Sequence, residues 1–512
     1  MESKTRKQLD VWTFCSAILI GLLAHGYVFV NKFSYRDDIH MQDGVGATFS
    51  SGRWGLGICQ KLVTFFGGGT FSLPWFNGIV SLLFLAGTAV LLVRLFDVRN
   101  RFIGSLIAGV IVTFPAMTVL YSLMFTSFYY TFAIMISVLA VYLIEMWKRP
   151  VLSSVAAICL IAFGIGIYQA YIGFPVCCFL ICYLLHLLGD KEETLKEQLL
   201  RALWYAGILI GGLVCYLIGN KVFLAILHIE LTDYQGIGSM YDMSITRIIR
   251  NVIAAYANFF LNHDQTTVHT NVFVEKMRYM HILSLVLLVV LGGILLYRLI
   301  KQKCYKEGVL AVLVAMVFPL GVNLVYVMNA SYMYQLMLHA KCMTFVLLFV
   351  LLEKGGFLEK GKVAFALRWL TLLLGVYMCV FYSYYANRCY QQAQVAQSRT
   401  IAWMTTLETQ IKSQDGFSDS MQIAYLNEPC NSDLTYIVDS EFSNVELMGF
   451  TLDLRFYNSW RDFMKFWTGF HMNEVDETTY EILREDPEIQ AMPHYPNAGS
   501  IRIVDDIVVV NF

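Results

Sequence analysis

The feature that most constrains this sequence is a series of apolar runs, each long enough to cross a lipid bilayer. A helix of about twenty residues spans the ~30 Å hydrocarbon core, because each residue adds ~1.5 Å. Only 15% of the residues are charged and 57% are hydrophobic, which is not the composition of a soluble chain. The runs lie at about 11–30, 75–95, 102–121, 128–147, 151–168, 172–188, 202–227, 279–299, 309–328, 336–352 and 364–385. They predict an α-helical polytopic membrane protein with about eleven spanning helices.

Positive charges predict the orientation of these helices. Lys and Arg gather at the N-terminus and in every second gap between the runs, which the positive-inside rule makes cytoplasmic. The basic residues of the gaps are Arg94, Arg99, Arg101, Lys148, Arg149, Lys191, Lys196, Arg201, Arg298, Lys301, Lys303, Lys306, Lys354, Lys360, Lys362 and Arg368. An odd number of spans then places the segment after Tyr385 outside the cytoplasm. No small-residue cleavage site follows the first run, so we expect a retained anchor.

Two domains are expected from the change in composition near Asn387. Residues 1–386 form the membrane domain, with long outer loops at about 31–73 and 228–278, and residues 387–512 form a small soluble α/β domain outside the cytoplasm. In the second loop, Ile245 to Phe260 has the spacing of an amphipathic helix that lies in the membrane interface. In the soluble domain the pattern predicts helices at Trp403–Ile411 and Trp460–Phe470 and strands at Met421–Leu426 and Ile501–Val510.

The 12 cysteines do not form a zinc-type array, and most lie inside apolar runs, where a thiol acts as a small hydrophobe. A Cys389–Cys430 disulfide outside the cytoplasm is one open alternative. The net charge of −1 argues against a nucleic-acid partner. The chain also lacks a Walker loop and a Gly-rich dinucleotide fingerprint, so no cofactor is predicted from motifs.

The first outer loop carries the strongest chemical signal. Asp37 and Asp38 follow the first span directly, and Arg53 and Trp54 come about fifteen residues later. Adjacent carboxylates disfavour joint ionisation, so one of them holds a proton more readily, as a general base needs. Arg53 offers a planar fork of donors that suits a phosphate, and Trp54 offers a flat apolar face. The alternative is that the acidic pair ends the first helix at the water boundary while Arg53 reaches the headgroups.

Further candidates lie on the outer side. Lys341, beside His339, could bind a phosphate, although a lysine that only reaches the headgroups has the same pattern. Tyr168 and Gln169 suit sugar hydroxyls, or else they are an aromatic belt residue and a capping amide. His263 and Asp264 suit an acceptor, an acid–base pair or a divalent cation; a solvated turn is the alternative. The sequence leaves the metal unknown.

These motifs together resemble the bacterial glucosyltransferase II family, whose members modify O-antigen with sugar from a polyprenyl-phosphate donor. The resemblance is carried by Asp37-Asp38, Gly52-Arg53-Trp54, Ile167–Tyr171, Met492–Pro496, Gly499–Ile501 and Val508–Val510. It implies a GT-C-type fold, in which a carboxylate of the first outer loop is catalytic. By this resemblance Asp38 would deprotonate the acceptor, with Asp37 supporting it.

The resemblance also implies the partners and the place of action. We expect a lipid-linked donor such as undecaprenyl phosphate glucose, a cell-envelope glycan as acceptor, and a multi-pass location in the bacterial inner membrane with a cytoplasmic N-terminus. A transporter or flippase of a lipid-linked sugar remains an alternative, although such proteins usually show internal repeats and charged residues inside their spans. Another GT-C-type transferase that uses a different sugar is the third possibility.

Overall fold

The computed structural model describes residues 2–33, 48–67, 72–189, 193–232, 244–261, 272–328, 333–357, 361–427, 429 and 459–512. The chain divides into two compact units, the first built mainly from residues up to Arg388 and the second mainly from Cys389–Phe512. Asp37, Asp38, His263, Asp264 and Cys430 lie outside the described residues.

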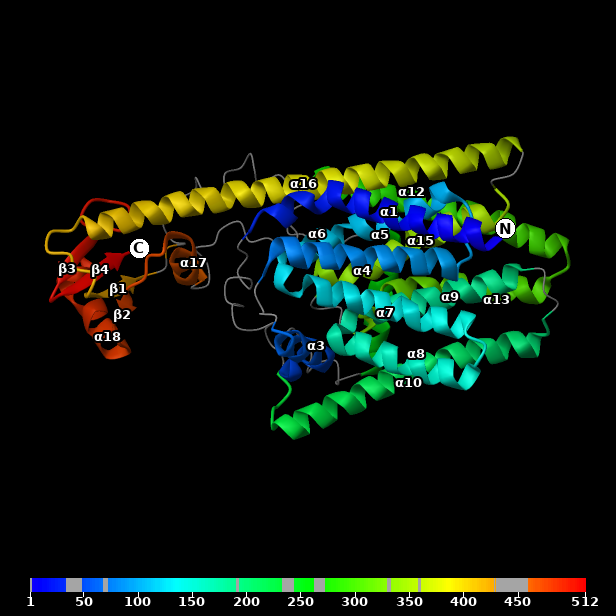
Figure 1. Cartoon of the computed structure of the whole chain (residues 1–512), viewed down its shortest axis with the longest axis horizontal. Helices are drawn as coiled ribbons and strands as arrows, with labels where there is room; N and C mark the ends of the chain where they lie inside the picture. Colours follow the sequence, from blue (N-terminus) through cyan, green and yellow to red (C-terminus); the bar gives the residue numbers. More distant parts are fainter. Residues whose placement is uncertain are drawn as a thin grey trace. The chain divides into compact units, whose positions relative to one another are not determined.

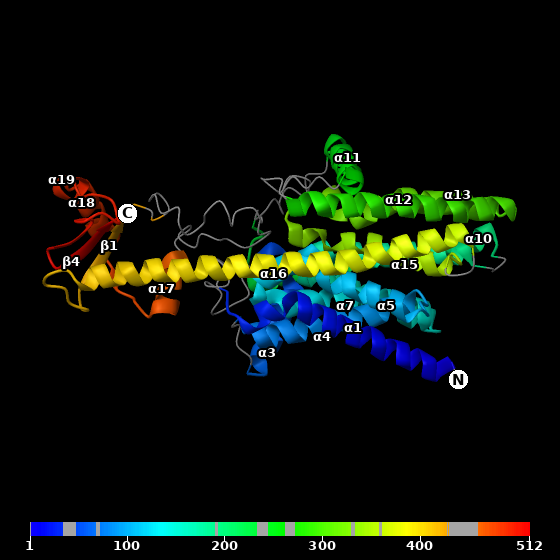
Figure 2. The same cartoon turned by 90° about the horizontal axis from the view of Figure 1, so that it is seen from above.

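The first unit is a bundle of membrane-spanning helices (Figures 1 and 2). Within the described ranges, 10 helices are long and apolar enough to cross a membrane, and there are 11 if a bent pair counts as one span. The prediction of a polytopic helical membrane protein is therefore confirmed. The α-helices of the described chain up to Lys412, including those too short to span, are α1 (Glu2–Val30), α3 (Trp54–Phe65), α4 (Pro74–Leu95), α5 (Arg101–Thr113), α6 (Pro115–Ser122), α7 (Ser127–Met146), α8 (Pro150–Ile167), α9 (Gly173–Leu188), α10 (Leu195–Leu227), α11 (Ile245–Leu261), α12 (Val272–Lys301), α13 (Tyr305–Val322), α14 (Leu324–Met328), α15 (Cys342–Lys354) and α16 (Lys362–Lys412).

Burial orders these helices from the centre of the bundle to its edge. The span that ends in α15 is 94% buried, whereas that of α10 is 22% buried. Helix α4 packs between α1 and α7, and α8 packs between α7 and α10 (Figure 1). α15 is therefore the central helix, and α10 presents most of its surface to lipid.

Two expected spans are interrupted. The run 102–121 divides into α5 and α6, which meet at a bend of 40°. Pro115 occupies the first turn of α6, where its missing N–H costs nothing. The run 309–328 is not one helix, because α13 ends at Val322 and Asn323 donates its side-chain N–H to the Ala255 carbonyl of α11, at 2.9 Å.

Short 3₁₀ turns precede three of the spans. They are η2 (Met124–Thr126) before α7, η3 (Gln169–Ile172) before α9, and η6 (Gln335–Lys341) before α15, while η1 (Phe49–Ser51) precedes α3. Helix α15 runs from η6 at one end of the bundle to Lys354 at the other. We call the end with η3 and η6 the η end and the end with Lys354 the basic end.

The second unit contains a sheet of four strands in the order β2-β1-β4-β3. Strand β1 (Gln422–Leu426) is parallel to both β2 (Asn473–Glu474) and β4 (Ile507–Asn511). The expected strand Ile501–Val510 is a hairpin of β3 (Ile501–Val504) and β4, because Asp505 and Asp506 both adopt positive φ, as a two-residue hairpin turn requires.

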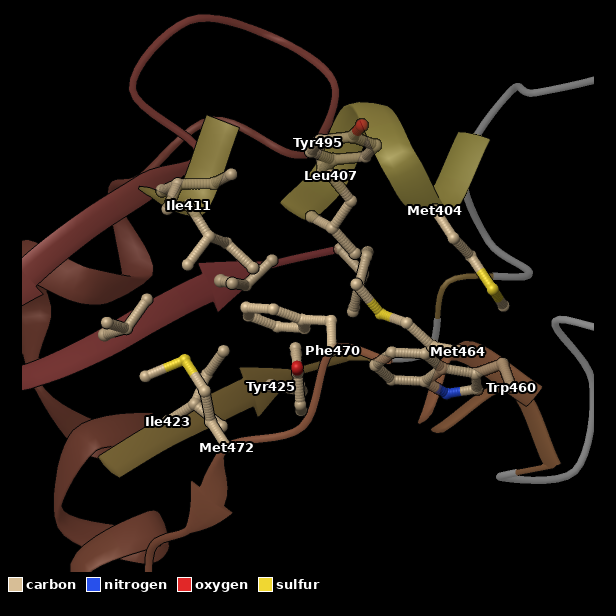
Figure 3. Close-up of a cluster of buried hydrophobic side chains, with 14 of the residues drawn as sticks. Met404, Leu407, Ile411, Ile423, Tyr425, Trp460, Met464, Phe470, Met472 and Tyr495 are labelled. Atoms are coloured by element: carbon tan, nitrogen blue, oxygen red, sulfur yellow. The ribbon is translucent and has the colours of Figure 1, made fainter. Parts of the chain in front are cut away.

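Helices cover this sheet and complete its core (Figure 3). Trp403, Leu407 and Ile411 of α16 pack with Trp460 and Phe463 of α17 (Ser459–Thr468), which confirms the predicted helix near Trp460. Two short helices, α18 (Glu477–Glu485) and α19 (Pro487–Gln490), follow. Helix α16 continues without a break through Asn387, where the sequence suggested a boundary, because residues 376–412 contain neither Gly nor Pro.

Candidate active site

The segment before α3 is folded into a tight turn. Gly52 has φ +72, and the Arg53 N–H donates to the Thr48 carbonyl at 2.7 Å. A Cβ at Gly52 would lie 2.8 Å from the Tyr216 hydroxyl and 3.1 Å from the Gln169 amide nitrogen. Glycine is therefore required here both by the backbone conformation and by the lack of space.

Two side chains hold this turn by its carbonyl oxygens. Gln169 Nε2 donates to the Ser51 carbonyl at 2.8 Å and to the Tyr216 hydroxyl at 3.3 Å. The Tyr216 hydroxyl in turn donates to the Gly52 carbonyl at 3.1 Å. We call Gln169 and Tyr216 the turn clamp. The amide N–H groups of Gln169 are thus engaged within the protein.

Trp54 anchors the start of α3 in the bundle. Its indole is 8% exposed, stacks on Phe223 at 5.6 Å and donates its N–H to the Tyr216 carbonyl at 3.3 Å. A Cβ at Gly166 or Gly219 would come within about 3 Å of this ring, so α8 and α10 make room for it with glycines. Such burial favours a packing role for Trp54 over an exposed surface for a sugar.

The clamped turn directs Arg53 toward an aromatic pair. The Arg53 guanidinium carbon lies 5.3 Å from the centre of the Tyr168 ring, and Nη1 lies 3.5 Å from the Tyr130 hydroxyl. Tyr130 and Tyr168 are stacked at 4.6 Å, and Tyr171 meets both rings edge-on. A guanidinium beside ring faces gains cation–π attraction while its planar fork is held in one orientation.

The aromatic cluster continues to η6. The Tyr171 ring lies 6.1 Å from the ring of His339, which is fully buried, and η3 packs against η6. Lys341, at the end of η6, is 3% exposed. A lysine that only reached the headgroups would be exposed, so this burial is not that of a lysine at the membrane surface.

The structure thus brings Arg53, Trp54, Tyr168 and Gln169 together at the η end, with Lys341 on the adjacent segment. Sequence reasoning missed Tyr130 and Tyr216. The sequence did carry a signal for Tyr216, because Tyr216 and Asn220 stand one helical turn apart inside an apolar run. The structure shows that both side chains are buried. The predicted roles of Asp37, Asp38, His263 and Asp264 fall outside the described residues. In the part of the chain that is described, no group of three or more His, Cys, Asp or Glu side chains is placed to hold a metal ion.

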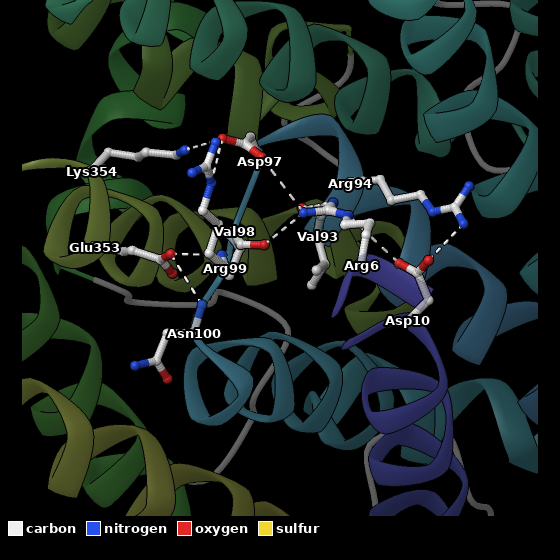
Figure 4. Close-up of polar contacts among 10 residues, drawn as sticks. All are labelled: Arg6, Asp10, Val93, Arg94, Asp97, Val98, Arg99, Asn100, Glu353 and Lys354. Carbon is white, nitrogen blue, oxygen red and sulfur yellow. Dashed lines mark hydrogen bonds and ion pairs between the residues drawn. The ribbon is translucent and has the colours of Figure 1, made fainter. Parts of the chain in front are cut away.

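An ionic cluster occupies the basic end (Figure 4). Asp97 lies 2.8 Å from Lys354 Nζ and 3.6 Å from an Arg6 nitrogen, so α1, α15 and the turn after α4 are joined. Burial by itself raises the pKa of Asp97, but the hydrogen bond and charge of Lys354, with Arg99 and Arg6, outweigh it and lower the pKa. This cluster stabilises the packing of the helices and lies at the opposite end of α15 from η6.

A family model described as "Glucosyl transferase GtrII" matches residues 26–352, more than half of the chain. The matched range contains Arg53, Trp54, Tyr168, Gln169 and Lys341. No curated protein and no solved structure matches the chain.

Proposed function

Because the chain belongs to the glucosyl transferase GtrII family, we propose that it transfers glucose from a polyprenyl-phosphate donor to a cell-envelope glycan at the outer face of the membrane. It would do so as a GT-C-type enzyme of the bacterial inner membrane. The family supports a sugar donor and a glycan acceptor in general terms, and the bundle of spanning helices is suited to a donor carried on a lipid.

One observation carries the proposal, namely the placement of Arg53. The turn clamp fixes the backbone of this residue, and the Tyr130–Tyr168 pair lies beside its guanidinium. A transferred sugar leaves behind a phosphate, whose negative charge grows as the glycosidic bond breaks. A preoriented guanidinium stabilises such a charge more than a mobile one, since it does not have to reorganise during the reaction.

The reaction we propose uses the acidic pair of the first outer loop. Asp38 accepts the proton of an acceptor hydroxyl, with Asp37 supporting it, and the acceptor oxygen forms a bond to the anomeric carbon. The bond from that carbon to the phosphate oxygen breaks, and polyprenyl phosphate leaves with the electron pair. Arg53, and Lys341 from η6, bind its phosphate. Positive charges at the basic end support a cytoplasmic N-terminus and an η end that faces outward.

The test is transfer of radiolabelled glucose from undecaprenyl phosphate glucose to isolated envelope glycan by the full-length protein in lipid nanodiscs. Donors with mannose or galactose, offered at the same concentration, identify the sugar. Labelled glycan with the glucosyl donor supports the proposal. If the folded protein transfers no sugar but moves the labelled donor between leaflets of proteoliposomes, the transporter alternative replaces it.

A further inference from the structure

An acidic side chain is largely enclosed at the basic end of the bundle, far from the candidate active site. Glu145 lies in the last turn of α7, and its side chain is 12% exposed. His186 Nε2, in the last turn of α9, donates to one carboxylate oxygen at 3.0 Å, and the Tyr205 hydroxyl of α10 donates to the other. We call these three residues the Glu145 cluster. An ionisable group inside a membrane span is costly to bury, so its presence indicates a role.

The helices that meet at the Glu145 cluster are the same helices that build the candidate active site. Helix α7 carries Tyr130 near its start, α10 carries Tyr216, and α9 follows directly on η3, which contains Gln169. On α10 the two sites are separated by about 17 Å of helix, at 1.5 Å per residue. Each helix of the cluster therefore also leads to a side chain that contacts Arg53 or its turn.

Helix α10 depends on polar contacts for its position. Its span is 22% buried, so most of its surface faces lipid. The buried residues of α10 are Gln198, Tyr205, Ile208, Gly212, Tyr216 and Asn220. Among these six, Ile208 alone is aliphatic. Helices in lipid gain no hydrophobic energy from association, so packing and hydrogen bonds hold them together. The bonds of Tyr205 and Tyr216 therefore fix the rotation and the depth of α10 in the bundle.

The turn clamp tolerates little movement of these helices. Gln169 and Tyr216 hold the turn with hydrogen bonds of 2.8 Å and 3.1 Å. A helix moves as a rigid unit, and a shift of about 1 Å would stretch such bonds beyond their effective length. The same shift would separate Tyr205 from Glu145 and leave a carboxylate oxygen without its donor, which is costly inside a membrane. The carboxylate therefore opposes the movement that would open the clamp.

We propose that the Glu145 cluster sets the register of α9 and α10 and thereby positions the turn clamp on the backbone of Arg53. Its members are positioning residues, which touch no substrate and act on the site through Gln169 and Tyr216. The effect on sugar transfer rests on the proposed function, whereas the effect on the turn does not.

The experiment follows amide hydrogen exchange of residues 49–54 in the full-length protein in nanodiscs. The Arg53 N–H, bonded within the turn at 2.7 Å, reports whether the turn is closed. Tyr205→Phe removes one bond of the Glu145 cluster and keeps the ring. The matched control is Tyr183→Phe, because Tyr183 is buried 6.5 Å from the Tyr205 ring and its hydroxyl has no hydrogen-bond partner among the described residues. We expect Tyr205→Phe to speed exchange of the turn at least threefold and the control to leave it unchanged.

A second control separates positioning from a general loss of stability. Glu353 of α15 accepts from the backbone N–H groups of Arg99 and Asn100, at 2.6 Å and 3.1 Å, and so joins helices that carry no residue of the turn clamp. Glu353→Gln should lower the Tm without changing exchange of the turn. Faster exchange in Glu353→Gln equal to that in Tyr205→Phe, or unchanged exchange in Tyr205→Phe, would overturn the proposal.

A transfer assay then distinguishes the Glu145 cluster from the proposed function. Tyr205→Phe should raise the KM for the donor about threefold and change kcat less, because the cluster positions Arg53 and not the general base. Faster exchange with an unaltered KM would uphold the cluster and reject donor binding by Arg53. Faster exchange in a protein that transfers no sugar would uphold the cluster and reject the proposed function. Unchanged exchange with normal transfer by the wild type would do the reverse.

Discussion

The guanidinium carbon of Arg53 lies 5.3 Å from the centre of the Tyr168 ring, beside the hydroxyl of Tyr130. Both rings are buried, so they cannot turn freely away from the cation. The arrangement depends on a flat cation, because a guanidinium can lie along a ring face and present its donors at its edge, whereas an ammonium group cannot.

We therefore expect Arg53→Lys to impair donor binding although the charge is kept. The KM for the polyprenyl-phosphate donor should rise about tenfold, corresponding to about 1.4 kcal/mol of lost interaction, in a transfer assay with varied donor. Arg368→Lys is the matched control, since its guanidinium lies 5.3 Å from the Phe365 ring, away from the η end. Equal KM values for the wild type and Arg53→Lys would show that Arg53 does not bind the donor.

The acidic pair is predicted to carry the proton transfer. Asp38→Asn should lower kcat by about 10²–10⁴-fold, as loss of a general base does, while Asp37→Asn should have a smaller effect. Radiolabel transfer at saturating donor measures both. Retention of full activity in the two variants, with normal insertion, would remove the chemical basis of the mechanism.

The turn clamp predicts that Tyr216 acts by positioning Arg53, without touching the substrate itself. Tyr216→Phe removes the hydroxyl that bridges Gln169 and the Gly52 carbonyl but leaves the backbone carbonyl that accepts from Trp54. The loss should reduce stability by about 1 kcal/mol, measured as a lower Tm, and reduce transfer as Arg53 loses its fixed orientation. Tyr377→Phe, at an exposed position, is the control. A Tm and a rate equal to those of the control would contradict the clamp.

Gly52 and Gly67 form a natural pair for testing the turn. Both have positive φ, but a Cβ at Gly67 meets no atom of the described residues within 4 Å, whereas one at Gly52 would lie 2.8 Å from the Tyr216 hydroxyl. Gly67→Ala should therefore cost only the backbone strain of about 1–2 kcal/mol. Gly52→Ala should cost more in thermal melts and should also abolish transfer. Similar melts for the two variants would show that the turn is not held tightly.

Asp97 provides a prediction about pH. Its pKa is lowered in the folded protein, so its contribution to stability is present above the pKa of the unfolded chain and is lost as the pH falls through the folded pKa. The side chain is 51% exposed, so this contribution is modest, about 0–1 kcal/mol. Asp97→Asn should lower the Tm at pH 7, and the difference should shrink below pH ~4. A difference that is independent of pH would assign the effect to packing.

The sequence predicted the membrane bundle well because a helix needs about twenty apolar residues to cross the bilayer, and that requirement is visible in the sequence itself. It also located the helix at Ser459–Thr468, whose apolar residues recur at helical spacing. The break at Asn323 could not be read, because it depends on a hydrogen bond to Ala255, a residue that is distant in sequence.

The candidate site was predictable only in part. Residue type and the expected side of the membrane pointed to Arg53, Tyr168 and Gln169, which the structure brings together, and their roles stay predictions. Tyr130 was missed, because a tyrosine near the start of a span is common at membrane interfaces and nothing local distinguishes it. Its contact with Arg53 joins α7 to the segment before α3, and such a pairing exists only in three dimensions.

Helix α11 has a consequence for how the bilayer acts on the enzyme. It buries Asn251 and Asn258 and exposes Ile245, Ile249 and Ile253, the reverse of a helix in water. The side of α11 that exposes these isoleucines is therefore most stable where it lies in the hydrocarbon region of the bilayer, which fixes the depth of the helix. In a bilayer of different thickness the helix would have to shift or leave apolar area mismatched, at a cost of fractions of a kcal/mol per Å. Because the Asn323 side chain at the α13–α14 break donates to the Ala255 carbonyl of α11, that mismatch would be transmitted to α13.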